Sequence, residues 1–196
     1  MIEWLKDIDQ AILIAINNWN SGLCDEIMWL LTGKIIWFPF YFFLFILAYR
    51  KMPKKSFILF TVMGFATIGF ADFTANYGIK KTVQRYRPSH HLELGQNLKL
   101  YTFEDGNQYR GGKYGFISGH ATNSFVIAVF FGLFLKRHYR YIFGILLFWA
   151  LLICYTRLYL GVHYPSDIIG GMIYGSTIAV LGHLLFKRLR KERIFQ

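Results

Sequence analysis

Residues 56–79 read SFILFTVMGFATIGFADFTANYGI, an apolar run whose single charged side chain is Asp72. A membrane-crossing helix needs about 20 mostly apolar residues, so this run predicts one. The composition agrees, because 55% of the 196 residues are hydrophobic and only 17% are charged. Soluble domains carry roughly 25% charged residues. The chain is therefore predicted to be a membrane protein, and its net charge of +11 does not indicate nucleic acid as a partner.

Four more apolar stretches are predicted to cross the membrane. They are Ile35–Tyr49, His120–Leu135, Tyr139–Tyr155 and Pro165–Phe186. The first two are short and need flanking residues to complete a span. With residues 56–79, the sequence contains five predicted spans.

Residues 3–31 follow a different pattern. Polar residues such as Asn17 and Asp25 interrupt any apolar run of about 20 residues, while apolar residues recur at helical spacing. The recurring residues are Leu5, Ile8, Ile12, Ile16 and Trp19. We predict an amphipathic helix in the membrane interface, with a sixth crossing as the alternative. The expected fold is all-α: a polytopic membrane helical bundle of five to six transmembrane helices with an N-terminal interfacial helix.

Basic residues cluster after the first, third and fifth predicted spans. The clusters are Arg50, Lys51, Lys54 and Lys55; Lys136, Arg137 and Arg140; and Lys187, Arg188, Arg190, Lys191 and Arg193. Alternating spans place all three clusters on one side, which the positive-inside rule makes cytoplasmic. The C-terminus is then inside, and residues 80–119 and 156–164 face outward.

The chain is predicted to form one domain, residues 1–196, without internal repeats. It divides into the interfacial segment 1–31, the bundle 32–187 with an outer loop at 88–117, and a basic tail at 188–196. Loops of this length are usually functional or disordered. No cleaved signal peptide is expected, because the N-terminus lacks a basic stretch followed by an apolar run. Cys24 and Cys154 are expected to be free thiols.

Three polar groups of residues fall at the outer ends of predicted spans. They read KKTVQRYRP at residues 80–88, ISGH at 117–120 and TRLYLGVHYPSD at 156–167. Hydropathy and charge alone place all three on one face of the membrane. Each group by itself has an ordinary structural explanation, as an anchor, a helix start or a helix cap. Their convergence is what predicts a functional site.

Three cations in these groups have no matching acidic cluster. Lys80, Arg87 and Arg157 suit an anion with several oxygens, and Arg matches phosphate geometry bidentately. Ser118 and Gly119 open a predicted helix, whose free backbone N–H groups and dipole attract anions. The groups therefore predict a phosphate-binding site.

Two histidines supply groups for proton or phosphoryl transfer. His163 and Asp167 are four residues apart, so both can lie on one helical face. A carboxylate bonded to one ring nitrogen fixes the tautomer and leaves the other nitrogen free to attack. His120 can serve as an acid or base. A metal site on these residues is disfavoured, because the three cations would repel a divalent ion.

In order and spacing, these groups resemble the signature of the type 2 phosphatidic acid phosphatase superfamily. That signature has a Lys, six residues and Arg-Pro; then Pro-Ser-Gly-His; then Ser-Arg, five residues, His, three residues and Asp. The sequence departs from it at Ile117, where the signature has Pro, and at Thr156, where it has Ser. Thr keeps the hydroxyl, and the absence of Pro is expected to loosen the entry to the Ser-Gly-His turn.

The resemblance implies a role for each matching residue. His163 would attack phosphorus and form a phosphohistidine, Asp167 would orient it, and His120 would protonate the leaving oxygen. The phosphate oxygens would be held by Lys80, Arg87, Ser118, Gly119 and Arg157. The resemblance also implies that the reaction needs no metal or other cofactor.

By this resemblance, the protein is expected to be a lipid phosphatase acting at the outer face of a bacterial cytoplasmic membrane. Undecaprenyl diphosphate is an obvious candidate substrate, and phosphatidylglycerol phosphate, phosphatidic acid and lipid A phosphate are the open alternatives, which the sequence does not rank. A lipid phosphotransferase using the same phosphohistidine and a non-catalytic anion transporter are the alternatives. The expected partners are the lipid substrate and the bilayer.

Two further features concern helix packing. Asp72 lies about two turns before Lys80, and intramembrane acids are costly and tend to face the bundle. We expect Asp72 to support Lys80 or a helix contact. Gly171 and Gly175, in GMIYG, form a small-residue face that predicts close helix packing within the chain rather than a dimer interface.

Overall fold

The computed structural model describes residues 3–19 and 21–194, with side chains described to residue 190. Its helices are α1 Glu3–Asn17, α2 Gly22–Thr32, η1 Ile35–Trp37, α3 Phe38–Tyr49, α4 Lys54–Phe73, the π-helix η2 Thr74–Ile79, α5 Lys80–Val83, η3 Pro88–His90, α6 Leu94–Asn97, α7 Gly119–Leu135, α8 Ile142–Tyr159 and α9 Pro165–Ile194. Within these ranges the only β-structure is two isolated bridges. The predicted all-α fold is confirmed. The side chains of Lys191 and Arg193, and the end of the predicted basic tail, lie outside the described residues.

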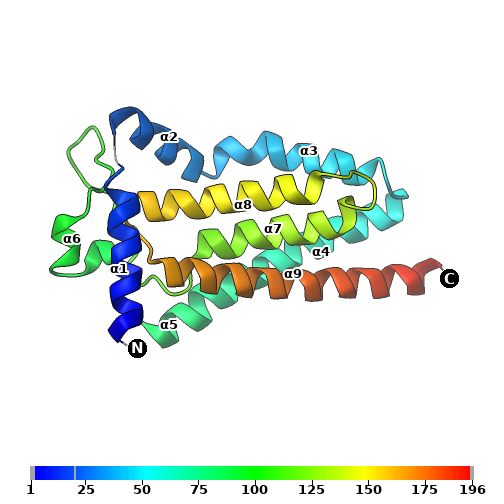
Figure 1. Cartoon of the computed structure of the whole chain (residues 1–196). Coiled ribbons are helices and arrows are strands. Elements are labelled where there is room, and N and C mark those ends of the chain that lie inside the picture. Colours follow the sequence, from blue (N-terminus) through cyan, green and yellow to red (C-terminus); the bar gives the residue numbers. More distant parts are fainter. Residues whose placement is uncertain (1–2, 20, 195–196) are drawn as a thin grey trace.

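The centre of the bundle is α7, which is mostly buried and, from residue 125 to residue 135, apolar on all faces. Figure 1 shows α3, α4, α8 and α9 running along the same long axis, and all four pack against α7. A helix that is hydrophobic all round is stable only when neighbours or lipid cover it. Phe60 on α4 is fully buried, with its ring centroid 5.0 Å from that of Phe130 on α7 and 5.2 Å from that of Phe186 on α9. Each such pair adds about 0.5–1.5 kcal/mol beyond burial.

Among the described residues, three helical segments are long and apolar enough to cross a membrane: Lys54–Val83, Ile142–Tyr159 and Pro165–Arg190. A fourth is the pair Gly22–Thr32 and Ile35–Tyr49 if it crosses as one unit, although it bends by 67°. The remaining predicted span corresponds to α7, whose 17 residues make it a shorter apolar helix. Because α7 lies at the centre of the bundle, its length need not match the hydrophobic thickness of the membrane.

The N-terminal segment is two helices, so the prediction of a single helix over residues 3–31 is wrong. The side chain of Asn17 explains the break. It donates to the carbonyl oxygens of Tyr159 at 2.7 Å and Lys99 at 2.8 Å, and accepts from the Lys99 N–H at 2.8 Å. These contacts hold the end of α1 against α8 and the outer loop, and the chain turns before α2.

Helix α1 crosses one end of the bundle (Figure 1). The apolar stripe predicted from the sequence faces outward, since Leu5, Ile8 and Ile12 are 40%, 47% and 42% exposed. The inward face carries Asp9, Leu13 and Asn17. A helix with its apolar face outward is suited to a membrane interface. It also places two polar side chains against the protein.

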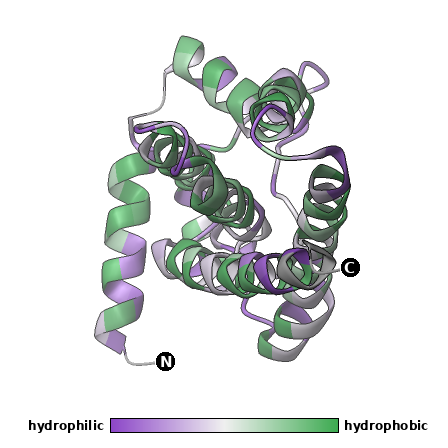
Figure 2. Cartoon of the chain, turned by 90° about the vertical axis from the view of Figure 1, so that its right-hand side faces the viewer, coloured by the Kyte–Doolittle hydropathy of each residue, from purple (hydrophilic) through white to green (hydrophobic). Residues whose placement is uncertain are grey.

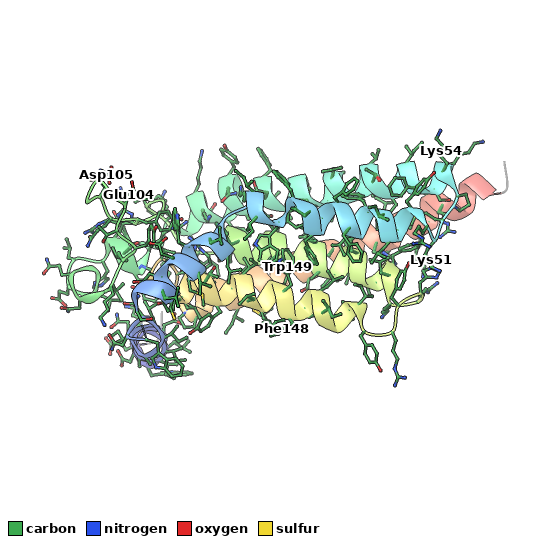
Figure 3. The ribbon with its side chains drawn as sticks, turned by 90° about the horizontal axis from the view of Figure 1, so that it is seen from above. Lys51, Lys54, Glu104, Asp105, Phe148 and Trp149 are labelled. Atoms are coloured by element: carbon green, nitrogen blue, oxygen red, sulfur yellow. The ribbon has the colours of Figure 1, made fainter. Side chains whose placement is uncertain are left out.

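The two ends of the bundle differ in charge. In Figure 3, Lys51 and Lys54 lie at one end, while Glu104 and Asp105, in the outer loop, lie at the other. The α3–α4 turn, the α7–α8 turn and the C-terminus share the basic end (Figure 1). Figure 2 shows hydrophobic residues along the helices and hydrophilic ones in their connections. The predicted basic clusters therefore gather at one end, opposite the outer loop.

Both predicted packing features are confirmed within the bundle. A Cβ on Gly171 would lie 2.7 Å from the Ser118 carbonyl oxygen, and one on Gly175 would lie 2.3 Å from that of Thr122. Only glycine therefore lets α9 approach α7 so closely. Asp72 Oδ1 accepts a hydrogen bond from Asn123 Nδ2 on α7 at 2.7 Å. Of the two supports expected from Asp72, the helix contact is the one observed.

Candidate active site

Lys80 stands near the end of the longest predicted span that lies away from Lys54. The helix is continuous from Lys54 to Val83, but residues 74–79 are π-helical, a distortion that often marks functional sites. Asn76, in this segment, accepts a hydrogen bond from Lys80 Nζ at 2.7 Å. A Cβ on Gly119 would lie 3.6 Å from both Lys80 Nζ and Asn76 Oδ1. The ammonium group therefore lies beside the first turn of α7.

The start of α7 is held by its own cap and by α9. The Ser118 hydroxyl accepts from the Ala121 N–H at 3.4 Å, and the Ser118 N–H donates to the Asp167 carbonyl at 2.9 Å. Ile117 is 2% exposed, and a Cβ on Gly170 would lie 2.8 Å from its Cγ2. Side-chain packing thus anchors this turn where the family signature has Pro.

Arg87 is buried beneath the outer loop. Its Nε donates to the Tyr114 carbonyl at 3.2 Å and its Nη1 to the Val162 carbonyl at 3.4 Å. Gly111 has φ +65°, and a Cβ there would lie 2.6 Å from Arg87 Nη1, so this glycine lets the loop cover the guanidinium. Burial, followed by the charge of Arg157, lowers the pKa of Arg87 to about 10. The group therefore remains charged at neutral pH.

Arg157 is fully buried near the end of α8. Its Nη1 donates to Thr32 Oγ1 at 2.5 Å and its Nη2 to the Tyr109 hydroxyl at 2.9 Å. Its Nε has no hydrogen-bond partner among the described residues. The neighbouring Thr156 hydroxyl donates to the Ile153 carbonyl at 2.7 Å, as hydroxyls in helices commonly do. The guanidinium is therefore held through both terminal nitrogens, while its Nε–H remains without a partner in the described part of the chain.

His163 and Asp167 form a fully buried pair at the start of α9. Asp167 Oδ2 lies 3.2 Å from His163 Nδ1 and accepts from the Tyr164 N–H at 3.1 Å. His163 Nε2 is buried and has no hydrogen-bond partner in the described part of the chain. Burial, followed by the positive charges of Arg87, Arg157 and Lys80, lowers the pKa of His163 well below its ordinary 6.5. The imidazole is therefore neutral at pH 7, with Nδ1–H directed at the carboxylate and Nε2 free.

Four of the five predicted phosphate-binding residues line two cavities that share His120, whereas Ser118 and Asp167 line neither. One, of about 460 Å³, has a polar end formed by Lys80, Arg87, Gly119 and His120. The other, of about 610 Å³, is lined by His120 and Arg157 and by the break between α2 and α3. His163 lines neither cavity but adjoins Val162, whose carbonyl oxygen binds Arg87. The structure thus gathers three segments, distant in sequence, at one end of the bundle.

Some side chains of this region were not identified from the sequence. They are Asp9, Thr32, Asn76, Arg85 and Tyr109. Arg85 lies inside KKTVQRYRP, where the family signature leaves the residue type open. Asp9 carried a weak signal, since it shares a helical face with Asn17 opposite the apolar stripe. Asn76 had a local signal, because it lies four residues before Lys80 on the same helical face. Thr32 and Tyr109 depend on contacts with the distant Arg157.

A helical membrane bundle that collects a buried imidazole–carboxylate pair and three cations at one end defines a membrane-embedded phosphatase. Residues 57–191 match the profile of the PAP2 superfamily, which is more than half of the chain. The chain therefore belongs to the PAP2 superfamily, in its membrane lipid phosphatase branch. This confirms the resemblance seen in the three motifs.

Three related proteins agree with this membership. The lipid A 4′-phosphatase of Bacteroides thetaiotaomicron is 36% identical over 196 residues, covering 98% of this chain and 84% of the relative. That of Porphyromonas gingivalis is 33% identical over 190 residues, covering 95% and 75%. The crystal structure of a PAP2-type phosphatidylglycerolphosphate phosphatase from Bacillus subtilis superposes with a TM-score of 0.64 at 20% identity, covering 96% and 87%. The last likeness concerns the fold alone.

Proposed function

We propose that this protein removes the 4′-phosphate of lipid A through a phosphohistidine at His163. The observation that carries the mechanism is the buried His163–Asp167 pair, in which Nδ1 is engaged and Nε2 is free. The substrate is supported by the two lipid A 4′-phosphatases that match this chain over nearly its whole length. Undecaprenyl diphosphate, an obvious candidate from the sequence, becomes the main competitor.

The first chemical step is attack on phosphorus. The lone pair of His163 Nε2 forms the N–P bond while the bond from phosphorus to the lipid oxygen breaks. His120 donates a proton to that oxygen, so the lipid leaves as an alcohol. The His163 Nδ1–H stays hydrogen-bonded to Asp167, which stabilises the positive charge that develops on the ring.

The second step is hydrolysis of the phosphohistidine. His120, now deprotonated, accepts a proton from a water molecule as the water oxygen attacks phosphorus. The N–P bond breaks, phosphate is released, and His163 returns to its neutral form. Both steps place negative charge on the non-bridging phosphate oxygens. Lys80, Arg87 and Arg157 would stabilise that charge as preorganised cations.

The lipid tail has a path from the site along the bundle. The 460 Å³ cavity is lined beyond its polar end by Phe38, Tyr41, Ile68 and Ile127. These same four residues also line an apolar cavity of about 530 Å³ between α3, α4 and α7. Shared walls make the two cavities neighbours, so a phosphate at His120 could keep its acyl chains in an apolar groove.

The basic clusters support an orientation for this site. They lie at the end of the bundle opposite the outer loop (Figures 1 and 3), and cytoplasmic loops carry excess Lys and Arg. We therefore place the C-terminus in the cytoplasm and the site at the outer face of the bacterial cytoplasmic membrane. After Cys24 and Cys154 are replaced, Asp105→Cys should react with a membrane-impermeant maleimide in intact spheroplasts. Labelling only after lysis would reverse the orientation.

A substrate panel tests the activity. The purified full-length protein is incubated in EDTA with lipid A phosphorylated at positions 1 and 4′, undecaprenyl diphosphate, phosphatidylglycerol phosphate or phosphatidic acid. Phosphate release and the mass of each product are measured. We expect the fastest turnover at the 4′ position. A preference for another lipid would overturn the substrate, and strict dependence on added divalent metal would overturn the histidine mechanism.

The wild type and one variant test the intermediate. Brief incubation with ³²P-labelled substrate should leave an acid-labile, alkali-stable label on the wild-type chain, as expected for phosphohistidine. His163→Ala should carry no label and release no phosphate. A non-catalytic anion transporter would not depend on His163 in this way. Label transferred to another lipid instead of water would identify the alternative, a phosphotransferase.

A further inference from the structure

Asp9 reaches from the N-terminal helix to the start of α9. It is 5% exposed, which is unusual for an acidic residue on a surface helix. Its Oδ1 accepts from the Ser166 N–H at 2.9 Å, and its Oδ2 accepts from the Ser166 hydroxyl. The carboxylate thus caps the first turn of α9, where a negative charge is favourable.

Arg85 joins this carboxylate to that of Asp167. Its Nη2 lies 2.8 Å from Asp9 Oδ2, and its Nη1 lies 3.0 Å from Asp167 Oδ1. The guanidinium also lies over the Tyr164 ring, 4.1 Å from its centroid. One planar group therefore contacts two acids and the residue that follows His163, an arrangement that a lysine cannot reproduce in full.

Asp167 is consequently held through both of its carboxylate oxygens. Oδ2 accepts from His163 Nδ1 and from the Tyr164 N–H, while Oδ1 accepts from Arg85. The side chains of Arg85, Asp9 and Asp167 are only 14%, 7% and 0% exposed, so water screens the charges weakly. Removing one partner would leave a buried charge uncompensated and free Asp167 to rotate.

The remaining contacts of α1 keep Asp9 in place. Leu13 is fully buried in a cluster with Leu94, Leu98, Leu100 and Tyr164. Asn17 binds the end of α8 and the outer loop. The inward face of α1 is therefore docked along its length on the segments that carry the site.

We propose that Arg85 and Asp9 are positioning residues that fix Asp167, and through it His163, so that the interfacial helix α1 is a working part of the active site. This inference rests on the proposed phosphohistidine mechanism. It differs from the family signature, which leaves position 85 open and does not extend to α1. Neither residue contacts the reacting phosphate in this account; both act through the orientation of the imidazole.

Kinetics of the full-length protein separate positioning from folding. Arg85→Gln and Asp9→Ala should lower kcat by about 10- to 100-fold. Losses of this size are common when a group that orients a metal-binding histidine is removed. KM and the inhibition constant of inorganic phosphate should stay within about threefold, because the phosphate-binding cations remain. Arg85→Lys should recover part of kcat, since an ammonium can keep one ion pair. Matched controls are Asp7→Asn and Lys81→Gln, both on exposed residues, which should keep wild-type kinetics.

A double-mutant cycle tests whether the two residues act as one unit. If Asp9 acts through Arg85, the double variant should be no slower than Arg85→Gln alone, whereas independent effects would multiply. The inference is overturned if either single variant keeps kcat within twofold, if the effects multiply, or if phosphate inhibition is lost together with kcat. If the wild type forms phosphohistidine and Arg85→Gln forms it at the same rate, this inference is wrong while the proposed function stands. A wild type that forms none would overturn the proposed function first.

Discussion

His163 Nδ1 lies 3.2 Å from Asp167 Oδ2, one helical turn away, and both side chains are fully buried. The carboxylate can therefore select the tautomer with the proton on Nδ1. In Asp167→Asn, the amide can donate to Nδ1, so the proton moves to Nε2 and blocks attack. The equivalent change in the Ser-His-Asp triad costs about 10⁴-fold in kcat, and we expect a loss of about 10³-fold or more. Steady-state phosphate release measures it.

Asp105→Asn is the matched control for this change. Asp105 is exposed in the outer loop and should tolerate the same substitution without loss of kcat. A kcat for Asp167→Asn within tenfold of wild type would contradict the assigned role of the carboxylate.

The depressed pKa of His163 predicts the acidic limb of the rate profile. The nucleophile is active when neutral, and its pKa lies well below 6.5 because of burial and the nearby Arg87, Arg157 and Lys80 charges. Loss of kcat/KM through protonation of the free enzyme should therefore begin below pH 6.5. Substrates whose phosphates ionise at different pH values separate this limb from ionisation of the substrate. A limb fixed at or above pH 6.5 for all substrates would contradict the prediction.

The same pKa makes stability depend on pH. The folded state holds His163 neutral, whereas in the unfolded chain the imidazole binds a proton near pH 6.5. The contribution of His163 to the free energy of unfolding is therefore constant above pH 6.5. It falls as the pH drops below 6.5, because the unfolded state takes up the proton first. As the pH is lowered from 7 to 5, the melting temperature in detergent should fall further, or rise less, in wild type than in His163→Gln, so the two curves of melting temperature against pH should differ in slope. Equal slopes of melting temperature against pH in wild type and His163→Gln would show that His163 does not contribute to the pH dependence.

The hydroxyl group of Tyr109 is predicted to support the site by holding Arg157. Its hydroxyl accepts from Arg157 Nη2 at 2.9 Å. Tyr109→Phe leaves a buried charged donor unpaired, which costs about 1–3 kcal/mol or more. We expect a lower melting temperature and about a tenfold loss in kcat/KM. Tyr141→Phe, on an exposed residue at the N-cap of α8, is the control, and unchanged kinetics in Tyr109→Phe would exclude this role.

Gly175→Ala tests the contact between α9 and α7. The new Cβ would lie 2.3 Å from the Thr122 carbonyl oxygen, so the helices must separate, at a cost of about 1–3 kcal/mol. The melting temperature in detergent should fall. Gly69→Ala places a methyl group where no heavy atom lies within 4 Å and should be neutral or slightly stabilising, because alanine favours helix. An equal change in melting temperature for Gly175→Ala and Gly69→Ala would refute the packing argument.

Much of the fold follows from the sequence because lipid imposes strict rules. Each long apolar run must be helical to satisfy its backbone hydrogen bonds, and residues 56–79 needed only small extensions to become Lys54–Val83. The His163–Asp167 pair was also accessible, because a spacing of four residues is a local property of a helix. The helix break in the N-terminal segment could not be predicted in this way. Its break at Asn17 depends on the backbones of Lys99 and Tyr159, which no local pattern encodes.

By itself, the sequence determined the membrane class, the helical segments and the residues of three motifs, since hydropathy, spacing and residue type are local quantities. The tertiary structure alone decided which distant groups support those motifs. Arg85 became a bridge between Asp9 and Asp167 only when α1 docked across the start of α9. Such a contact joins residues more than 70 positions apart, and its free energy depends on burial and geometry that exist only after the helices have packed.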